Sequence, residues 1–369
     1  MKIGIDARPL LPPLTGIGEY LRGFVNALAE RDGENRYFLF SHCPLNFPLP
    51  NQRWRIVHGR VNGRMRSTAW FQTAVPRWAR RLGIDLFWGP RHHLPLRLPV
   101  RTAAVVTIHD LVHRRHPGTM SLSNLLLERL LMGPSLRRAD RVAAVSRATA
   151  RELRRFHPHA DPKIRVVSPG IPAFPPEAAP AFPPPTPYFL AVGTREPRKN
   201  LERVMAAFER METRGRRVHL AVVGGGGWKQ RALDERLRSA RSDGRRIHLL
   251  DYVPRSVLPS LYRNAVALVY PSLYEGFGLP ILEAMSLGTP VITSDRSAMA
   301  EVAGTAALRV NPFRTRAIQR AMESLLREDR HSRYHREGAV RSAAFSWRRS
   351  ADDLRTIFSE AAAERAARS

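Results

Sequence analysis

A proline-rich segment divides the chain into two stretches that share one alternating pattern. Nine of the 30 prolines lie between Ser168 and Pro187, a density typical of a semi-rigid, extended connector. On both sides of it, short apolar runs rich in β-forming residues alternate with segments of helical spacing. Such alternation predicts parallel sheets covered by helices on both faces, so we expect two doubly wound α/β domains.

The pattern fixes the expected boundaries. A chain of 369 residues is longer than the roughly 250 to 300 residues at which single cores stop growing. We expect an N-terminal domain over residues 1–170, a linker over 171–187, a C-terminal domain over 188–345 and a helix over 346–369 that crosses back to the N-terminal domain. The expected strands of the first half are Lys2–Asp6, Tyr37–Ser41, Arg55–His58, Ile84–Trp88, Ala103–His109, Arg141–Ser146 and Ile164–Val167, and those of the second are Tyr188–Gly193, Val218–Val223, Ile247–Tyr252, Ala265–Tyr270, Pro290–Thr293 and Ala306–Val310.

The net charge and the cysteine content limit the partners and the cellular compartment that we expect. The formal net charge is +28, which favours polyanionic partners such as anionic lipid, nucleic acid or phosphorylated substrates. The single cysteine, Cys43, excludes an intramolecular disulfide, and the sequence has neither a membrane-spanning apolar run nor a secretory leader. We therefore expect a cytoplasmic protein, peripheral at most on the inner face of the cytoplasmic membrane.

The stretch from Tyr270 to Met285 carries the strongest chemical signal. It follows an expected strand and opens an expected helix, and Gly276 and Gly278 let the backbone approach a ligand closely. Free amides at such a helix start favour a phosphate. Glu275 and Glu283 would flank that anion and accept hydrogen bonds from sugar hydroxyls. The alternative is that both glutamates only complement a helix N-terminus.

The motif Glu275-x7-Glu283, which contains Gly276-Phe277-Gly278-Leu279-Pro280, resembles the signature of retaining GT-B glycosyltransferases of family 4, which includes bacterial mannosyltransferases. The resemblance covers nearly the whole chain. Its other motifs, in matching order, are Ile5–Arg8 followed by Thr15–Tyr20, Val106–Asp110, Val145–Thr149, Val192–Asn200, Gly224–Trp228 and Phe345–Trp347. It implies a GT-B fold, in which two Rossmann-like domains face each other across a cleft.

The resemblance also implies an activity. We expect a hexosyltransferase of EC class 2.4 that moves a sugar from a nucleotide donor, with GDP-mannose as the first candidate. The acceptor would be a glycan or a polyprenyl-diphosphate-linked oligosaccharide of lipopolysaccharide or exopolysaccharide synthesis. Because the sequence contains no Asp-x-Asp pair, we expect a metal-independent enzyme with no cofactor, the nucleotide sugar being a substrate.

Donor-binding roles follow from the same resemblance. Glu283 would bind the ribose hydroxyls, Glu275 the hydroxyls of the transferred sugar, and Lys199 the diphosphate leaving group. The turn of Gly276, Phe277, Gly278 and Leu279 would complete the donor site.

One position departs from the family pattern. Many relatives carry an arginine five residues before the lysine, where this chain has Thr194, so Arg198 or Arg195 must supply the second cation. Growing negative charge on the departing phosphate requires such fixed cations.

Two residues of the first half complete the expected site. Gly16, in the loop before the first helix, would let the N-terminal domain close over the diphosphate. His109 follows a strand, and the resemblance implies that it lies against the transferred sugar as a catalytic residue. The alternative is a structural histidine at the end of a strand.

Two other functions compete with this interpretation. His109 and His113, with Asp110 between them, resemble a metallohydrolase pair, yet the preceding run is β-like and such ligands must lie one turn apart on a helix. The basic composition also suits a nucleic-acid-binding protein. However, the sequence has no zinc-finger spacing, no RRM motif and no basic tail, so we expect no nucleic acid partner.

The acceptor surface is expected in the first half. The stretch Arg53–Arg81 mixes arginines with Trp70, Phe71 and Trp78, and Ser121–Leu136 forms a leucine-rich helix. Both suit an anionic membrane surface. The alternative is that the aromatic residues and leucines pack in the core while the arginines face water.

Overall fold

The computed structural model describes residues 1–180, 183–213, 215, 217–226, 233, 235 and 246–368, apart from the side chains of residues 64, 65 and 328–330. The chain forms two compact units. Unit 1 comprises Met1–His113, Leu122–Pro172 and Phe345–Ser369, and unit 2 comprises Arg114–Ser121 and Ala173–Ala344. The expected motif Gly224–Trp228 lies partly outside the described residues, from residue 227 onward.

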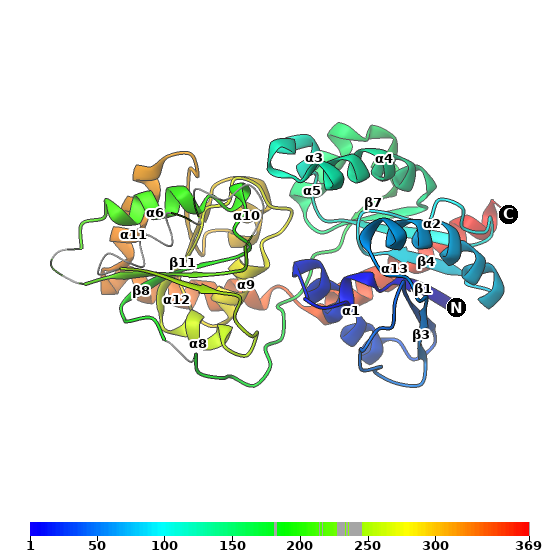
Figure 1. Cartoon of the computed structure of the whole chain (residues 1–369), viewed down its shortest axis with the longest axis horizontal. Coiled ribbons are helices and arrows are strands. Elements are labelled where there is room, and N and C mark those ends of the chain that lie inside the picture. Colours follow the sequence, from blue (N-terminus) through cyan, green and yellow to red (C-terminus); the bar gives the residue numbers. More distant parts are fainter. Residues whose placement is uncertain are drawn as a thin grey trace. The chain divides into compact units, whose positions relative to one another are not determined.

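Unit 1 is built on a parallel sheet of seven strands in the order β3-β2-β1-β4-β5-β6-β7. Figure 1 draws this unit in blue to teal, with the C-terminal segment in red. The chain winds outward from β1 to β3, returns to place β4 beside β1, and winds the other way to β7. The strands are β1 (Lys2–Asp6), β2 (Arg36–Ser41), β3 (Trp54–His58), β4 (Leu86–Gly89), β5 (Ala103–Ile108), β6 (Arg141–Ala144) and β7 (Ile164–Val166).

Helices cover both faces of this sheet because successive strand residues point to opposite sides. Phe87 packs in a core with residues of α2, α4 and α5, whereas its neighbour Trp88 contacts Phe24 of α1 and Phe358 of α13 at ring distances of 5.5 and 5.8 Å. The helices of unit 1 are η1 (Arg8–Leu10), α1 (Gly16–Arg31), α2 (Arg64–Leu82), α4 (Leu122–Arg138), α5 (Arg147–Phe156), η3 (Pro158–Lys163) and α13 (Trp347–Ala367). Helix α3 (Val112–Arg115) begins in unit 1 and ends in the segment Arg114–Ser121 of unit 2, which also contains η2 (Pro117–Thr119).

Unit 2 repeats the architecture with six parallel strands in the order β10-β9-β8-β11-β12-β13. The strands are β8 (Tyr188–Val192), β9 (His219–Val223), β10 (Ile247–Asp251), β11 (Ala265–Tyr270), β12 (Val291–Ser294) and β13 (Leu308–Val310). The described helices are η4 (Pro197–Lys199), α6 (Leu201–Glu209), α8 (Leu258–Arg263), α9 (Leu279–Ser286), α10 (Ser297–Ala303), α11 (Thr315–Leu325) and α12 (Glu328–Ala343).

Each expected strand overlaps an observed one, and the two doubly wound sheets confirm the predicted fold class. In each sheet the chain winds in opposite directions from one pair of neighbours, β1 and β4 in unit 1 and β8 and β11 in unit 2. Ligands of doubly wound sheets bind outside the carboxyl ends of such strands. Within the described residues, no helix is both long and apolar enough to span a bilayer.

Candidate functional site

Two loops of unit 2 bring a lysine, an arginine and a glutamate together. Lys199 ends η4, which follows β8, and Glu275 lies in the loop after β11. Lys199 Nζ lies 2.7 Å from Oε1 of Glu275, and Arg198 Nη1 lies 2.5 Å from Oε2. The Tyr270 hydroxyl donates to Oε1 at 3.0 Å. Since β8 and β11 are the neighbours from which the sheet winds apart, this cluster occupies the usual ligand position of the fold.

The cluster holds permanent charges. Burial alone would raise the pKa of Glu275, but Arg198 and Lys199 outweigh it and lower that pKa to about 2. For Lys199, burial opposes the charged form, yet the Glu275 carboxylate raises the lysine pKa. Glu196, 2.6 Å from Arg198 Nη2, has a raised pKa chiefly because it is buried. Lys199 and Glu275 are therefore both ionised at neutral pH.

Asn200 fastens the two loops to each other. Its backbone is left-handed, with φ of 62°, a conformation that asparagine tolerates. Its side-chain amide donates to the carbonyl oxygens of Pro271 at 3.0 Å and Pro312 at 2.7 Å, and Leu273 N–H donates to the Arg198 carbonyl at 2.8 Å. These bonds fix the cations relative to the loop of Glu275, so a ligand meets preorganised charges.

The glycine turn leads directly into helix α9. Gly278 caps the helix with φ of 107°, a backbone conformation that favours glycine, and a Cβ there would lie 3.0 Å from Ile281 Cδ1. Leu279 and Pro280 form the first turn of the helix, whose leading amides favour an anion. Phe277 is buried and anchors the turn in unit 2.

Glu283 has its own partners. Arg255 Nη1 lies 3.1 Å from Oε1, and the Tyr262 hydroxyl of α8 donates to Oε2 at 2.9 Å. Burial and the Glu283 carboxylate raise the pKa of Tyr262, which keeps its proton for this bond. Glu283 lies beyond the first turn of α9 and Glu275 pairs with side-chain cations. The two glutamates therefore do more than complement a helix N-terminus.

The two arginines proposed as the second cation have different surroundings. Arg195 Nη1 lies 2.8 Å from Asp251 Oδ1 and donates to the Gly224 carbonyl at 2.7 Å, at the ends of β10 and β9. Arg198 contacts Glu275 and donates to the Tyr274 carbonyl at 2.9 Å. Arg198, rather than Arg195, shares the carboxylate that holds Lys199.

In unit 1, His109 follows β5 and has a fixed orientation. Its Nε2 lies 2.7 Å from the Pro90 carbonyl oxygen, which requires a hydrogen on Nε2 and leaves the Nδ1 lone pair to accept a bond. Burial and the nearby His92 lower the pKa of His109 to about 3, so the imidazole is neutral at pH 7. The Tyr20 ring packs edge-on at 4.7 Å, and the Thr149 hydroxyl donates to the His109 carbonyl at 3.0 Å.

Gly16 and Gly18 differ in how much space a side chain would have. A Cβ on Gly18 would lie 2.6 Å from the Pro9 carbonyl oxygen, so close packing requires glycine there. At Gly16, the first residue of α1, a Cβ would meet no heavy atom of the described residues within 4 Å, apart from its chain neighbours and the backbone of its own helix. Packing in unit 1 therefore does not require glycine at position 16.

His109 and His113 do not form the helical pair of a metallohydrolase. His109 directly follows a strand, whereas His113 lies in α3, so the two do not occupy successive turns of one helix. Across the described ranges, no three His, Cys, Asp or Glu side chains gather in a way that could hold a metal ion. The geometry gives the metallohydrolase interpretation no support.

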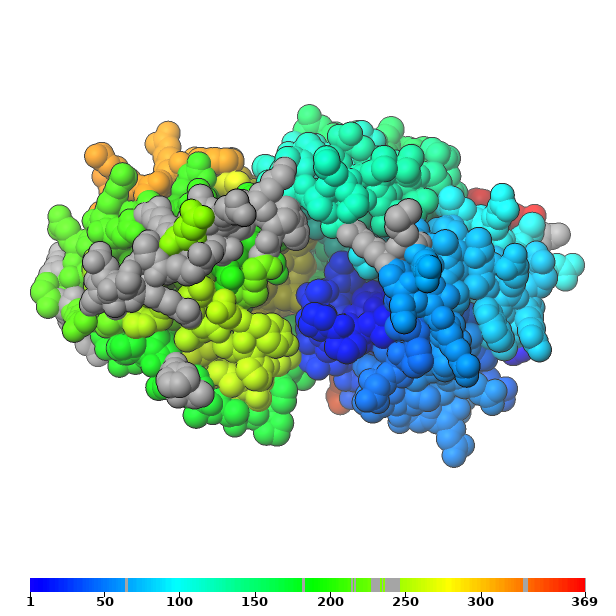
Figure 2. Space-filling model, viewed as in Figure 1, coloured from blue at the N-terminus to red at the C-terminus, as the bar shows by residue number. Residues whose placement is uncertain are grey.

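The two expected membrane-facing stretches differ. Trp70 and Phe71 are buried in the core of unit 1, so the core-packing interpretation is correct for them. In α4, Leu122, Leu126 and Leu130 are 83%, 59% and 60% exposed, and their spacing of four places them on one helix face. The segment that contains α4, coloured teal in Figure 2, lies on the surface.

Several residues of the site were not predicted. Tyr270, which ends β11, binds both Lys199 and Glu275, while Arg255 and Tyr262 bind Glu283. A signal did exist for Tyr270 and Arg255, because both lie at or just after the carboxyl end of a strand, where ligands of this fold bind. Tyr262 carries no such signal, since it reaches Glu283 from within a helix.

Comparison with known proteins finds relatives of nearly the whole chain. A family model described as "Glycosyl transferases group 1" matches residues 177–341, and one described as "Glycosyltransferase Family 4" matches residues 14–173. The O-antigen chain mannosyltransferase B of Escherichia coli is 33% identical over 375 residues, which cover 94% of this chain and 96% of that protein. The serotype-specific mannosyltransferase WbdA of Escherichia coli is 29% identical over 264 residues, which cover 66% of this chain and 32% of that protein. The structure of sucrose-phosphate synthase from Thermosynechococcus elongatus superposes with a TM-score of 0.77 at 22% identity over 98% of each chain.

Proposed function

The chain belongs to glycosyltransferase family 4, and we propose that it transfers mannose from GDP-mannose to a glycan acceptor with retention of the anomeric configuration. The choice of mannose is supported by the names of the Escherichia coli relatives. The observation that carries the proposal is the cluster of Lys199, Arg198 and Glu275 at the carboxyl edge of the unit 2 sheet.

Lys199 and Arg198 stabilise the leaving group in this reaction. As the bond between the anomeric carbon and the diphosphate breaks, negative charge grows on the phosphate oxygen. Two fixed cations and the leading amides of α9 are suited to stabilise that charge. Arg198 supplies the second cation, which relatives provide with an arginine at the position of Thr194. This assignment follows because Arg198 and Lys199 bind the same Glu275 carboxylate.

Glu275 positions the transferred sugar and does not attack it. Both of its carboxylate oxygens accept bonds from cations, and its low pKa makes it a weak nucleophile. The acceptor hydroxyl instead attacks the anomeric carbon on the face that the diphosphate leaves. The new bond forms from the hydroxyl oxygen, and the departing phosphate oxygen takes the hydroxyl proton. His109, neutral and fixed in orientation, offers Nδ1 to a hydroxyl of the sugar.

Glu283 holds the nucleotide. Hydrogen bonds from Arg255 and Tyr262 fix the orientation of its carboxylate. Two vicinal ribose hydroxyls can donate hydrogen bonds to such a carboxylate. The turn of Gly276, Phe277, Gly278 and Leu279 brings the backbone close to the diphosphate. The family resemblance assigns Gly16 to the same group, and packing in unit 1 does not require that glycine.

Unit 1 binds the acceptor in this proposal. The acceptor class is a polyprenyl-diphosphate-linked oligosaccharide of cell-surface polysaccharide synthesis, reached at the inner face of the cytoplasmic membrane. The exposed leucines of α4 and the net charge of +28 suit contact with an anionic membrane surface. The reaction needs no metal ion, because side-chain cations stabilise the leaving group.

A donor screen tests the proposal. GDP-mannose, UDP-glucose and UDP-N-acetylglucosamine are supplied in turn, with a chelator present, and both donor hydrolysis and the shift in unfolding temperature are recorded. We expect GDP-mannose to give the largest response and the chelator to have no effect. A response to a UDP-sugar alone would contradict the donor, and silence with every nucleotide sugar would contradict the reaction.

A further inference from the structure

The proline-rich linker is attached to unit 2 beside Glu283. The second segment of unit 2 begins at Ala173, and the backbone N–H of Ala178 donates to the Ser256 carbonyl at 2.9 Å. Arg255, the residue before Ser256, donates from Nε to the Ala173 carbonyl at 3.3 Å. The loop after β10 therefore holds the start of the linker at two points, and one of them is the arginine that also binds Glu283.

Phe174 of the linker packs against both residues that hold Glu283. The Arg255 guanidinium lies over the Phe174 ring, 4.7 Å from its centre. The Tyr262 ring packs edge-on against the same ring, with centres 6.4 Å apart, within the range of favourable aromatic pairs. Since Arg255 and Tyr262 each donate to one carboxylate oxygen of Glu283, the four side chains form a closed ring of contacts.

This ring of contacts determines where further donors can approach Glu283. A carboxylate has about four lone-pair sites, and Arg255 and Tyr262 each occupy one on a different oxygen. Two sites are left, which is the number that two vicinal hydroxyls require. Arginine has many rotamers, and stacking on Phe174 restricts those of Arg255 before a nucleotide arrives. The ring of Phe174 therefore preorganises the acceptor of the hydroxyls.

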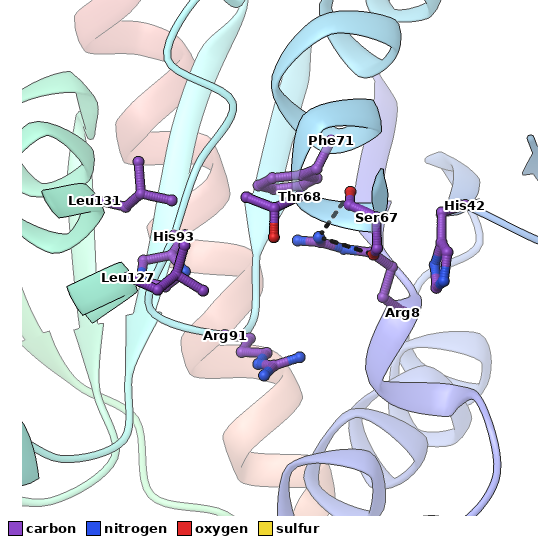
Figure 3. Close-up of a pocket in the computed structure, with 9 residues that line it drawn as sticks. All are labelled: Arg8, His42, Ser67, Thr68, Phe71, Arg91, His93, Leu127 and Leu131. Carbon is purple, nitrogen blue, oxygen red and sulfur yellow. Dashed lines mark hydrogen bonds between the residues drawn. The ribbon is translucent and has the colours of Figure 1, made fainter. Parts of the chain in front are cut away.

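Unit 1 contains a similar arrangement of arginine, carboxylate and aromatic ring, which shows what is unusual about Phe174. Arg8 donates to both oxygens of the buried Asp6, and its guanidinium lies 3.8 Å from the centre of the Phe71 ring (Figure 3). Phe71 belongs to helix α2 and is buried in the core. Phe174 is half-buried and lies in the linker, outside the strands and helices. It can therefore be replaced without opening a cavity in the core of unit 2.

We propose that Phe174 is a positioning residue for the nucleotide: by holding Arg255 and Tyr262, it orients the Glu283 carboxylate toward the two ribose hydroxyls. The inference rests on the proposed function, in which Glu283 binds the ribose. It adds the linker to the donor site, so recognition of ribose depends on a residue that does not touch the nucleotide.

The test compares nucleotides that differ only in the ribose hydroxyls. Calorimetric titration of the full chain gives the affinities for GDP and 2′,3′-dideoxy-GDP, and for UDP and 2′,3′-dideoxy-UDP, because both bases carry the same ribose. The ratio of the two affinities within a pair is the ribose preference, and it isolates the hydroxyl contacts from the rest of the nucleotide.

Three variants of the linker are compared. Phe174→Leu keeps an apolar side chain but removes the ring, whereas Phe174→Tyr keeps the ring. Glu177→Gln is the matched control, because it removes the exposed ion pair between the linker and Arg263 of α8, which is not part of the ring of contacts around Glu283.

We expect Phe174→Leu to lower the ribose preference by at least about threefold, as loss of a partly exposed cation–π contact allows, and to change the affinity for the dideoxy nucleotide by less than about twofold. Phe174→Tyr and Glu177→Gln should keep the wild-type preference. Arg255→Gln should also lower the preference. Adding Phe174→Leu to Arg255→Gln should then have a smaller effect than Phe174→Leu alone, because the two residues act together.

Three results would overturn the role of Phe174 while the wild-type chain prefers the ribose. These are an unchanged preference in Phe174→Leu, an equal loss of affinity for both members of a pair, and an equal fall in preference in Glu177→Gln. If the wild-type chain binds both members of each pair equally, or binds no nucleotide, the proposed function is contradicted and the inference with it. Tighter binding of UDP than of GDP contradicts only the proposed donor, and the UDP pair then decides the role of Phe174.

Discussion

Lys199 and Glu275 form a buried ion pair across two loops of unit 2, with Nζ 2.7 Å from Oε1. Arg198 and Tyr270 bind the same carboxylate, so Glu275 collects three donors. Removing one partner of a buried pair leaves the other charge poorly compensated, which costs more free energy than the pair itself contributes. In the proposed reaction the cluster therefore affects both catalysis and the stability of unit 2, and experiments must separate the two.

Replacing Lys199 should reduce catalysis in the folded enzyme. We expect Lys199→Ala to lower kcat by about 100- to 1,000-fold, the usual loss when a preorganised charge stabiliser is removed. Lys199→Arg keeps the charge and should lose far less. Both rates are divided by the folded fraction, taken from thermal unfolding at the assay temperature. If Lys199→Ala only lowers the folded fraction, Lys199 has a structural role and the leaving-group assignment is wrong.

Arg198 and Arg195 form a matched pair for locating the second cation. Arg198→Gln should lower kcat/KM for GDP-mannose by about 10- to 100-fold, because a charge-assisted contact to the diphosphate is lost. Arg195→Gln removes a contact to Asp251 and Gly224 and should change kcat/KM by less than about threefold. Steady-state kinetics with varied donor decide between them. The reverse order of effects would assign the second cation to Arg195.

Glu283 is tested with altered nucleotides. Wild-type enzyme should bind GDP about 10- to 100-fold more tightly than 2′,3′-dideoxy-GDP, because hydrogen bonds to a charged acceptor contribute about 1.5 to 3 kcal/mol. Glu283→Gln should bind both nucleotides with nearly equal affinity. Calorimetric titration measures the four constants. The variant also weakens the contacts with Arg255 and Tyr262, so its unfolding temperature should fall. If Glu283→Gln still binds GDP much more tightly than 2′,3′-dideoxy-GDP, Glu283 does not bind the ribose hydroxyls.

Acid should destabilise the fold through His109 and Glu275. The pKa of His109 falls from 6.5 to about 3 on folding, so the unfolded chain binds more protons in that window and stability is lost as the pH falls from 6.5 towards 3. Glu275, whose pKa falls from 4.5 to about 2, stabilises the fold above pH 4.5 and loses that contribution as the pH falls towards 2. The two contributions have the same sign.

Thermal unfolding between pH 7.5 and 4 checks this dependence. We expect His109→Gln to flatten the decline in unfolding temperature between pH 6.5 and 4, and Glu275→Gln to leave that range nearly unchanged. The pH profile of kcat should show no titration of His109 between pH 6 and 8. A decline that is equally steep in His109→Gln would show that another group titrates there.

The fold and part of the site could be predicted because both depend on local patterns. Buried strands such as Phe189 to Val192 are continuous apolar runs, and Lys199 and Glu275 each follow such a run, which places them at one sheet edge. Of the two partners of Glu283, Tyr262 could not be predicted, since it lies 21 residues away and reaches Glu283 from within α8, whereas Arg255, 28 residues away, follows the end of β10.

For the basic stretch Arg53–Arg81, the core-packing alternative is correct for Trp70 and Phe71, and the sequence alone could not decide this. Arginines beside Trp70 and Phe71 indicate a mixed surface, but sequence alone does not show which helix face the sheet covers. In α2 the aromatic residues face the core, while in α4 three leucines face outward. Both helices carry apolar residues on more than one face, so their hydrophobic pattern does not distinguish these cases before the sheet is assembled.

Helix α13 gives unit 1 a discontinuous chain. Residues Phe345–Ser369 belong to unit 1 although unit 2 precedes them, and Arg365 pairs with the buried Asp140, with Nη2 2.6 Å from Oδ1. Chains emerge from the ribosome N-terminus first. Unit 2 has therefore been fully synthesised before α13 is available to pack against β5. Until α13 packs there, part of the apolar surface of unit 1 stays exposed to water and to chaperones.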